Sequence, residues 1–319
     1  MTNILTITAP IYLLIAIGFG AARFGVFTKA DAQVLGRFVL QFALPAMLFS
    51  ALASRDFSDV LHPAYLLAYT LGSLTAFGFA WMTGWWVARD DDTLRALMGM
   101  GGANSNSGYI GYPILLQVLG PAAGVGLAMT LVVENMLMIP FALSLAESGQ
   151  SQHASWQRNV IDSFKRLARV PMMWAIVLGF VFSMMGWHLP EFMNKAVNLF
   201  AVACAGTALF VNGCMLVGLR VQGLMQQVSG IVVGKLLIHP LAVGFFLWQL
   251  GPVEVSLQIS GVVLAAMPML SIYPLFAQRF GREGLCAAAL LVTTLVSFFT
   301  ISTLLAVSVW VPGWSGVFH

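Results

Sequence analysis

Residues 99–120 read Gly-Met-Gly-Gly-Ala-Asn-Ser-Asn-Ser-Gly-Tyr-Ile-Gly-Tyr-Pro-Ile-Leu-Leu-Gln-Val-Leu-Gly. The segment is long enough to cross a bilayer, but its middle, residues 104–108, is Asn-Ser-Asn-Ser-Gly. Glycine lowers helix stability, and Asn and Ser side chains compete for the hydrogen bonds of the backbone. Pro113 lacks an N–H group and clashes with the preceding turn. We therefore expect a helix that is broken at bilayer depth.

Two interpretations of this break are open. Irregular backbone inside a bilayer survives only where it is buried in protein or lines a wet cavity. Broken helices of this kind form the substrate and ion sites of secondary transporters. The alternative is a Pro and Gly kink that only packs against its neighbours.

The composition of the chain indicates an integral membrane protein. Of its 319 residues, 59% are hydrophobic and 8% are charged, whereas soluble domains carry roughly 25% charged residues. Ten segments are apolar and long enough to span as helices. The first has no basic leader and no clear cleavage site, so we interpret it as a retained helix. The predicted spans are 6–22, 34–53, 64–87, 94–119, 122–146, 171–187, 193–218, 226–249, 256–280 and 285–310.

Several function classes are excluded by the motifs that the sequence lacks. The cysteines Cys204, Cys214 and Cys286 lie in apolar segments without metal-ligand spacing, so we expect neither a disulfide framework nor a metal site, and no cofactor. The sequence has no P-loop, so ATP does not drive it directly. It has no His/Asp/Glu cluster with catalytic spacing and no soluble sensor domain, which argues against an enzyme or a receptor. The net charge of +3 follows from the loops and does not indicate a nucleic-acid partner.

Basic residues predict the orientation in the membrane. Of the fifteen Lys and Arg residues, twelve lie at odd-numbered connections between spans, and only Arg55 and Lys195 lie at even-numbered ones. Cytoplasmic loops are enriched in basic residues, so both termini are expected on the outer face. The twelve are Arg23, Lys29, Arg37, Arg89, Arg95, Arg158, Lys165, Arg166, Arg169, Arg220, Arg279 and Arg282.

An internal repeat runs through the chain at a fixed offset of 161 residues. Its best piece is Tyr-Pro-x-x-x-Gln-x-x-Gly, which occurs at 112–120 and again at 273–281. Five spans per copy is an odd number, so the second copy must cross the membrane in the opposite sense. Sites in such inverted repeats lie near the midplane where the copies meet. We predict a first repeat at 1–146, a cytoplasmic linker at 147–170 and a second repeat at 171–319. The basic linker is either a surface amphipathic helix or a simple connection.

The second copy carries its own break. Residues 265–274 read Ala-Ala-Met-Pro-Met-Leu-Ser-Ile-Tyr-Pro, and each proline removes a backbone donor. Two breaks at corresponding positions favour a transporter over a packing kink. The second half of each broken helix presents free N–H groups and a partial positive charge, around 107–110 and around 269–272, which favours a carboxylate. Side chains in the breaks either add donors to this site or hydrogen-bond between helices.

Ionisable residues inside the predicted spans are few. Glu134 lies midway along the fifth span, and Lys235 and His239 share one face of the eighth. Charges at bilayer depth usually mark ion or proton pathways. Glu134 either pairs with Lys235, as a fixed structural pair, or carries a proton. His239 is the weaker candidate because it can cap near the membrane edge.

The motif Asn106-Ser-Gly-Tyr-Ile-Gly-Tyr-Pro113, the earlier Leu44-Pro45-Ala46 and the five-plus-five plan resemble the auxin efflux carrier family across essentially the whole chain. Its bacterial members include predicted malonate and malate permeases of the inner membrane. The resemblance implies an all-α fold of ten transmembrane helices, shared with bile-acid/sodium symporters and sodium/proton antiporters. In that fold helices 4 and 9 cross, helices 1, 2, 6 and 7 form a scaffold, and helices 3–5 and 8–10 form a mobile core. Members often form homodimers through the scaffold.

The resemblance also implies a function and a site. We expect a secondary active transporter of a small organic anion, a dicarboxylate such as malonate, which works by elevator-type alternating access. Asn106 occupies the family position that contacts the substrate carboxylate. The second break lacks the Asn of plant members, which argues against an auxin-sized aromatic substrate. The predicted substrate residues are Asn104, Asn106, Ser107, Gly108, Tyr109, Pro113, Met267, Pro268, Met269 and Ser271, with Pro45 and Asn212 on the scaffold side.

The main alternative is a cation/proton exchanger or a sodium-coupled symporter of the same broad fold. An exchanger needs acidic residues at the crossing, and the two breaks themselves contain none. The sequence leaves open whether H+ or Na+ is the coupling ion, the direction of transport and the oligomeric state.

Overall fold

The structure is a computed structural model, and it describes residues 4–55, 62–88, 91–149, 171–218, 225–308 and Trp314. These residues form helices joined by short connections and contain no strand, so the predicted all-α class is confirmed. Their single β-type contact is an isolated antiparallel bridge between Ser105 and Met269. Most of the predicted linker, from residue 150 to residue 170, lies outside the described residues.

The helices follow the predicted spans closely, and several are interrupted by short π or 3-10 turns, which are labelled η. In the first half of the chain they are α1 (Ile4–Arg23), α2 (Lys29–Phe38), η1 (Val39–Ala43), α3 (Leu44–Ala53), α4 (Pro63–Val87), α5 (Asp92–Ala103), η3 (Ser107–Gly111), α6 (Tyr112–Leu119), η4 (Gly120–Ala122), α7 (Ala123–Val132), η5 (Val133–Met138) and α8 (Ile139–Ser148). In the second half they are α10 (Pro171–Met185), α11 (Glu191–Met215), α12 (Met225–Val233), η6 (Gly234–Ile238), α13 (His239–Gln249), α14 (Val255–Ala265), α15 (Tyr273–Gln278) and α16 (Glu283–Ser308).

Six helical runs among the described residues are long and apolar enough to cross a membrane, and three further apolar helices are shorter. The chain is therefore a multi-pass membrane protein, while the count of ten spans and their inverted orientation stay predictions. The six runs are Lys29–Ala53, Pro63–Val87, Ser107–Ser148, Glu191–Met215, Met225–Gln249 and Glu283–Ser308.

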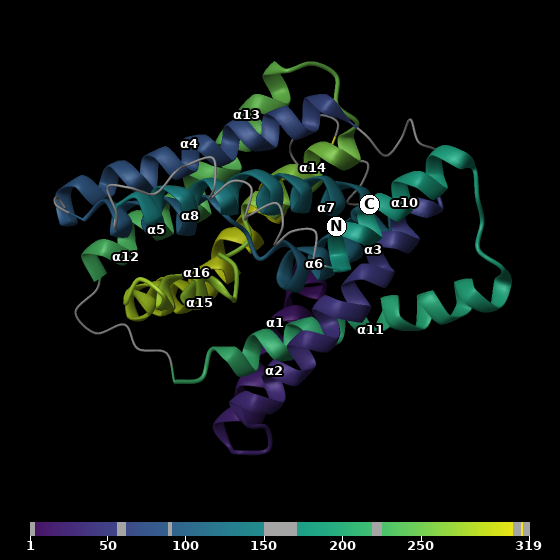
Figure 1. The fold of residues 1–319 in the computed structure, drawn as a ribbon, viewed down its shortest axis with the longest axis horizontal. Coiled ribbons are helices and arrows are strands. Elements are labelled where there is room, and N and C mark those ends of the chain that lie inside the picture. Colours follow the sequence, from purple (N-terminus) through teal and green to yellow (C-terminus); the bar gives the residue numbers. More distant parts are fainter. Residues whose placement is uncertain are drawn as a thin grey trace.

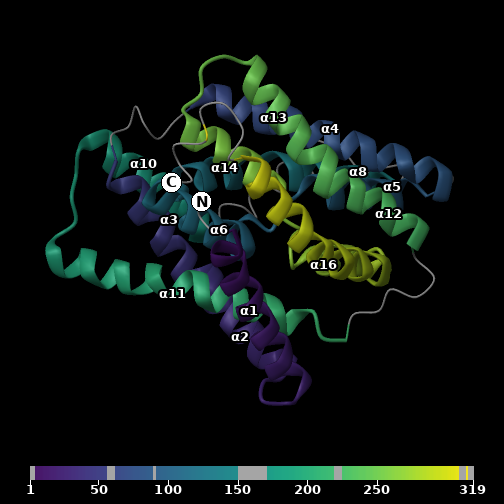
Figure 2. The same ribbon diagram turned by 180° about the vertical axis from the view of Figure 1, so that it is seen from behind.

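The helices pack in two groups that do not follow chain order. Helix α4 packs on α5 and α13, α5 on α8, α13 on α14, and α15 on α16. A second group forms where α11 packs on α1, α2 and α3, and α3 packs on α10. Figures 1 and 2 show the second group on one side of the molecule, with α4, α8, α12 and α13 on the other. Helix α6 contacts members of both groups.

Close approach of α1 to α11 explains why the second group is tight. A Cβ atom at Gly18 would lie 2.1 Å from the carbonyl oxygen of Phe210, and one at Gly213 would lie 2.0 Å from that of Ile15. Only glycine fits at either position. At Gly206, on the same helix, the position of a Cβ atom has open space around it, so the close approach is confined to the end of α11.

Each π turn among the described residues ends two residues before a proline. The prolines are Pro45, Pro113, Pro140 and Pro240, which follow η1, η3, η5 and η6. A proline lacks the N–H group and crowds the carbonyl four residues earlier. That carbonyl falls inside the preceding π turn in all four cases, so the wider turn accommodates the proline without ending the helix.

Three of these π turns carry residues predicted for the site. Turn η3 contains Ser107, Gly108 and Tyr109, η5 contains Glu134, and η6 contains Lys235. A π turn inserts one extra residue and changes which face the following side chains occupy, and such turns are frequent at functional sites. The local backbone thus sets where both buried charges point.

Candidate functional site

Both predicted helix breaks are present, and they lie against each other. Helix α5 ends at Ala103, Asn104 is extended, and the helix resumes at Ser107. The partner break separates α14 from α15. The backbone N–H of Asn106 donates to the carbonyl oxygen of Pro268 at 2.7 Å, beside the bridge between Ser105 and Met269. The two breaks therefore form one antiparallel contact inside the molecule.

The carboxylate of Glu134 reaches the first break from η5. Its Oε1 atom accepts hydrogen bonds from the Tyr69 hydroxyl at 3.1 Å, the Ser105 backbone N–H at 3.1 Å and the Ser107 hydroxyl at 2.9 Å. Its Oε2 atom is buried and has no hydrogen-bond partner among the described residues. The negative charge lies near the N-terminal end of the helix that starts at Ser107, where the helix dipole favours it.

The ammonium group of Lys235 has as many partners as it has protons. Nζ donates to Ser105 Oγ at 2.5 Å, to the Ala265 carbonyl oxygen at 2.9 Å and to His239 Nδ1 at 2.6 Å. An ammonium has three donors and no acceptor, so Nδ1 of His239 must accept. The proton of the neutral ring is then on Nε2, which donates to Ser73 Oγ at 3.0 Å.

Two of the alternatives left open for these groups do not match the geometry. His239 is fully buried and belongs to the Lys235 network, so it does not cap at a membrane edge. Glu134 and Lys235 form no direct ion pair, because Ser105 lies between them. Ser105 donates through its backbone N–H to Glu134 and accepts through its hydroxyl from Lys235.

A second polar cluster lies on the α11 side of the contact between the two breaks, which we call the crossing. Asn106 Nδ2 donates to Asn212 Oδ1 at 3.2 Å and to Ser271 Oγ at 2.7 Å, and the Ser271 hydroxyl donates to Asn212 Oδ1 at 2.5 Å. This cluster links both breaks to α11. Asn212 is thus in contact with the breaks, on the side predicted for the scaffold.

Two buried amide groups beside the crossing have hydrogen-bonding atoms without partners. Neither side-chain atom of Asn104 has a partner among the described residues, and the same holds for Asn212 Nδ2. A buried polar atom left unpaired costs about 1–3 kcal/mol, so such atoms require an explanation. The two unpaired Nδ2 donors are suited to an anionic ligand, whereas the unpaired Asn104 Oδ1 atom is an acceptor and needs a donor.

A cavity of about 440 Å³ opens beside the crossing. It is mainly apolar, it is lined from both helix groups, and no Asp, Glu, Lys, Arg or His is among its lining residues. Its size suits a small-molecule ligand. Polar or backbone-exposing residues in its wall are Gln41, Asn106, Gly108, Tyr109, Asn135 and Ser271.

The remaining predicted site residues lie at different distances from this cavity. Tyr109 lines it and ties its hydroxyl to the Gly36 carbonyl oxygen at 3.1 Å. Ser107 points instead to Glu134. Seven others are buried and do not line the cavity: Pro45, Asn104, Pro113, Asn212, Met267, Pro268 and Met269.

Sequence reasoning missed the contribution of α4. Tyr65, Tyr69 and Ser73 follow each other at intervals of four, so they share one helix face, and all three are buried. Tyr65 donates to the Gly126 carbonyl oxygen at 3.2 Å, Tyr69 contacts Glu134, and Ser73 contacts His239. This polar stripe within an apolar span was a detectable signal.

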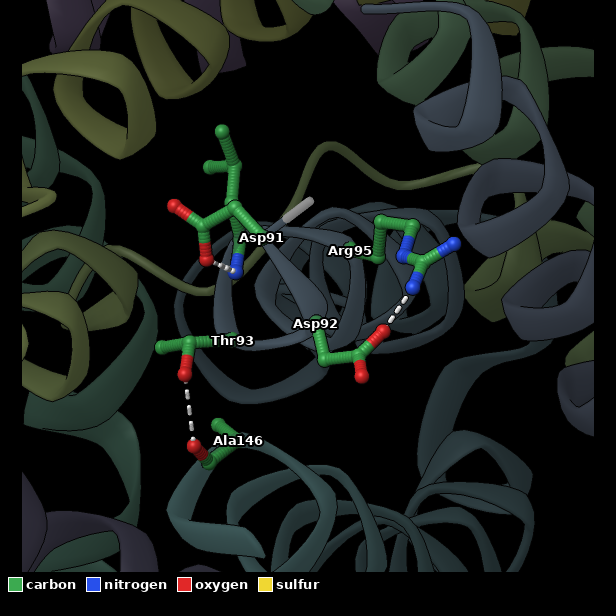
Figure 3. Close-up of polar contacts among 6 residues, drawn as sticks. Asp91, Asp92, Thr93, Arg95 and Ala146 are labelled. Carbon is green, nitrogen blue, oxygen red and sulfur yellow. Dashed lines mark hydrogen bonds and ion pairs between the residues drawn. The ribbon is translucent and has the colours of Figure 1, made fainter. Parts of the chain in front are cut away.

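Ion pairs fix the far end of the first broken helix. Asp91 caps α5 by accepting from the Leu94 N–H at 2.7 Å and also pairs with Arg282. Figure 3 shows Arg95 turned toward Asp92, with which it pairs, and Thr93 donating to the Ala146 carbonyl oxygen at 2.9 Å. These contacts join α5 to α8 and to the segment after α15. They hold the N-terminal end of α5, the end that lies away from the first break.

Three known proteins illustrate what this chain resembles: two are named as transporters, and the third is a larger protein that the chain matches over part of its length. A putative malonate transporter of Rhizobium meliloti is 24% identical over 308 residues, which cover 96% of both chains. An uncharacterized transporter of Escherichia coli, YfdV, is 24% identical over 239 residues, 73% of this chain and 74% of its own. The lysosomal cholesterol signaling protein of Mus musculus is 26% identical over 243 residues, 72% of this chain but 28% of its own.

A family comparison covers nearly the whole chain. The family described as "Membrane transport protein" matches residues 3–305. That range includes both breaks, the buried charges and the cavity lining. The chain therefore belongs to this family of membrane transport proteins, the auxin efflux carrier family that its break motif resembles.

Proposed function

We propose that the protein is a secondary active transporter of a small organic anion, and that a dicarboxylate such as malonate is its substrate. The observation that carries the proposal is the pair of helix breaks in contact, with Asn106 and Ser271 of the two breaks in the wall of a ligand-sized cavity. The unpaired Nδ2 donor of Asn212 lies directly behind these two side chains. The name of the Rhizobium meliloti relative supports malonate as the first anion to test.

Binding of the anion uses dipoles and amides in place of a fixed positive charge in the cavity wall. The first N–H groups to bond within the helix after the first break are those of Ile110 and Gly111, to the Asn106 carbonyl oxygen. The N–H groups of Ser107, Gly108 and Tyr109 precede them at the N-terminus of this helix, where N–H groups without helical partners favour a carboxylate. Asn104 Nδ2 and Asn212 Nδ2 add side-chain donors. Helix α15 has only six residues, so it adds a weaker dipole.

Transport proceeds by alternating access between the two helix groups. The cavity is lined by Leu40, Gln41 and Met172 from one group and by Asn106 and Ile139 from the other. Displacement of one group against the other would therefore carry the ligand from one face of the membrane toward the opposite face. In this proposal the group with α1–α3, α10 and α11 is the scaffold and dimer surface, the two five-helix halves are inverted repeats, and Glu134 carries a coupling proton.

The alternative function is cation/proton exchange on the same fold. One observation favours it: the Glu134 carboxylate reaches the crossing although the breaks themselves contain no acidic residue, and its Oε2 atom is unpaired. An exchanger would move cations without malonate. A transporter of anions would not.

The deciding experiment is uptake of labelled malonate into liposomes that contain the purified protein. We expect saturable uptake that excess unlabelled malonate inhibits, and heat release on malonate binding in calorimetry. Cation exchange that proceeds at full rate without any organic anion, together with absent malonate binding, would contradict the proposal and support the exchanger.

We also propose that the protein lies in the inner membrane with both termini on the outer face, and this orientation has a separate test. A cysteine placed at Ser151, in the linker, should react with impermeant thiol reagents only when the cytoplasmic face is open to them. Labelling of intact cells from outside would reverse the orientation.

A further inference from the structure

The first halves of both broken helices end near the same ammonium group. Helix α5 ends just before Asn104, and α14 ends at Ala265. The C-terminal end of a helix carries a partial negative charge of about half an elementary charge. Lys235 donates to the Ala265 carbonyl oxygen, the last of α14, and to Ser105, which lies two residues beyond the end of α5. One positive charge therefore serves two negative helix ends.

Two of the three partners of this ammonium are oxygens of the kind that bind a bare Na+ ion. A hydroxyl oxygen and a backbone carbonyl oxygen hold Lys235 at 2.5 and 2.9 Å, and a neutral ring nitrogen completes the set. The Glu134 carboxylate balances the charge through Ser105. Lys235, His239, Tyr69 and Glu134 are all fully buried, so water does not provide the compensation.

We propose that Lys235 is a built-in cation at the crossing, which takes the position of a coupling Na+ and makes transport independent of Na+. A second cation bound to the same oxygens would meet the ammonium at contact distance, and like charges repel strongly in a dry interior. The expectation of Na+-independent transport rests on the proposed function. The occupation of the cation position by Lys235 does not depend on which substrate the protein transports.

The first test uses the unchanged protein. Malonate uptake into proteoliposomes and the melting temperature of the purified protein are measured in Na+, K+ and N-methylglucamine buffers of equal ionic strength. We expect both quantities to agree among the three buffers, uptake within about twofold. A tenfold loss of uptake, or a lower melting temperature, when Na+ alone is withdrawn would overturn the proposal.

The second test removes the ammonium. Lys235→Ala leaves space where the charge was, so the variant should melt at a lower temperature, and methylammonium or Na+ should restore it in a saturable manner. Lys235→Met is the matched control, since its side chain fills the space without a charge and should not respond to either cation. An alanine variant that melts like the parent and ignores both cations would contradict the inference.

A third variant decides the matter if Lys235→Ala does not fold. Glu134→Gln combined with Lys235→Met removes both charges, and it should be more stable than Lys235→Met alone because no buried carboxylate is then left uncompensated. Equal stability of the two would count against a cation role. Cation rescue without malonate transport would refute the proposed substrate and support the role of Lys235. Na+-dependent malonate transport would support the substrate and refute the role of Lys235.

Discussion

The first break, residues 104–107, meets its surroundings mainly through side chains, whereas the second, residues 266–272, does so largely through its backbone. Ser105 and Ser107 reach the buried charges, and Asn106 reaches α11. The second break offers the Pro268 carbonyl oxygen to Asn106, next to the Ala265 carbonyl oxygen that Lys235 uses. Backbone atoms persist when a side chain is replaced. Substitutions in and around the first break should therefore be far more damaging than substitutions in the second.

The largest effect is expected at Glu134, the charge that the first break holds. Glu134→Gln keeps an oxygen acceptor for Tyr69, Ser105 and Ser107 but cannot carry a proton. Uphill uptake driven by a pH gradient should disappear, while exchange of internal for external malonate should persist. Both are measured in the same proteoliposomes. Accumulation at the parental rate would remove Glu134 from the coupling role.

The next largest effect is expected at Asn106. Both N–H bonds of the Asn106 amide are used by Ser271 and Asn212, so this side chain binds malonate only if one of them turns to the anion. Asn106→Ala removes that donor, and loss of a hydrogen bond to a charged partner costs about 1.5–3 kcal/mol, roughly tenfold to a hundredfold in affinity. Asn106→Asp should bind malonate more weakly still, because it adds a like charge. Calorimetry on the two purified variants is the measurement. Parental affinity in both would mean that this side chain only packs.

Asn104→Ala separates binding from stability. Its amide has no partner among the described residues, so its removal should leave the melting temperature unchanged or higher. Affinity for malonate should nevertheless fall about tenfold if the amide donates to the anion. A variant that loses stability and keeps its affinity would assign Asn104 to the fold.

The smallest effect is expected in the second break. Ser271→Ala leaves Asn212 Oδ1 as an acceptor for Asn106, so we expect less than about fivefold loss of affinity. The comparison of the two breaks would fail if this variant were weaker in malonate binding than Asn106→Ala.

The positions of both breaks could be predicted because their causes are local. Pro268, Pro274 and the run of residues 104–108 disfavour helix wherever they occur. The helix positions could be predicted for the same reason, since apolar length alone sets them. The contact between the breaks joins residues 164 positions apart, Ser105 and Met269, so only the repeat and the family resemblance could imply it.

Among the partners of the buried charges, the sequence indicated only His239, which shares a helix face with Lys235 and contacts it. Lys235 binds a backbone carbonyl oxygen, which no residue type announces. Glu134 and Lys235 each lie in a π turn, which shifts the helical phase and defeats a count of three or four residues per turn. The intervals of four at Tyr65, Tyr69 and Ser73 were legible, but their significance depends on the charges that face them.

The arrangement around Ser105 has a consequence for the order of synthesis. All three donors to Glu134 come from the first half of the chain, from Tyr69, Ser105 and Ser107. The carboxylate can therefore be accommodated before the second half exists. Lys235 follows Ser105 by 130 residues, which takes on the order of 10 s at a ribosomal rate of about 5–20 residues/s. His239 and Ala265 then supply the other contacts of Lys235 from the second half of the chain. Each half therefore provides most of the hydrogen bonds to its own charged group, and the Ser105 hydroxyl links the two halves last.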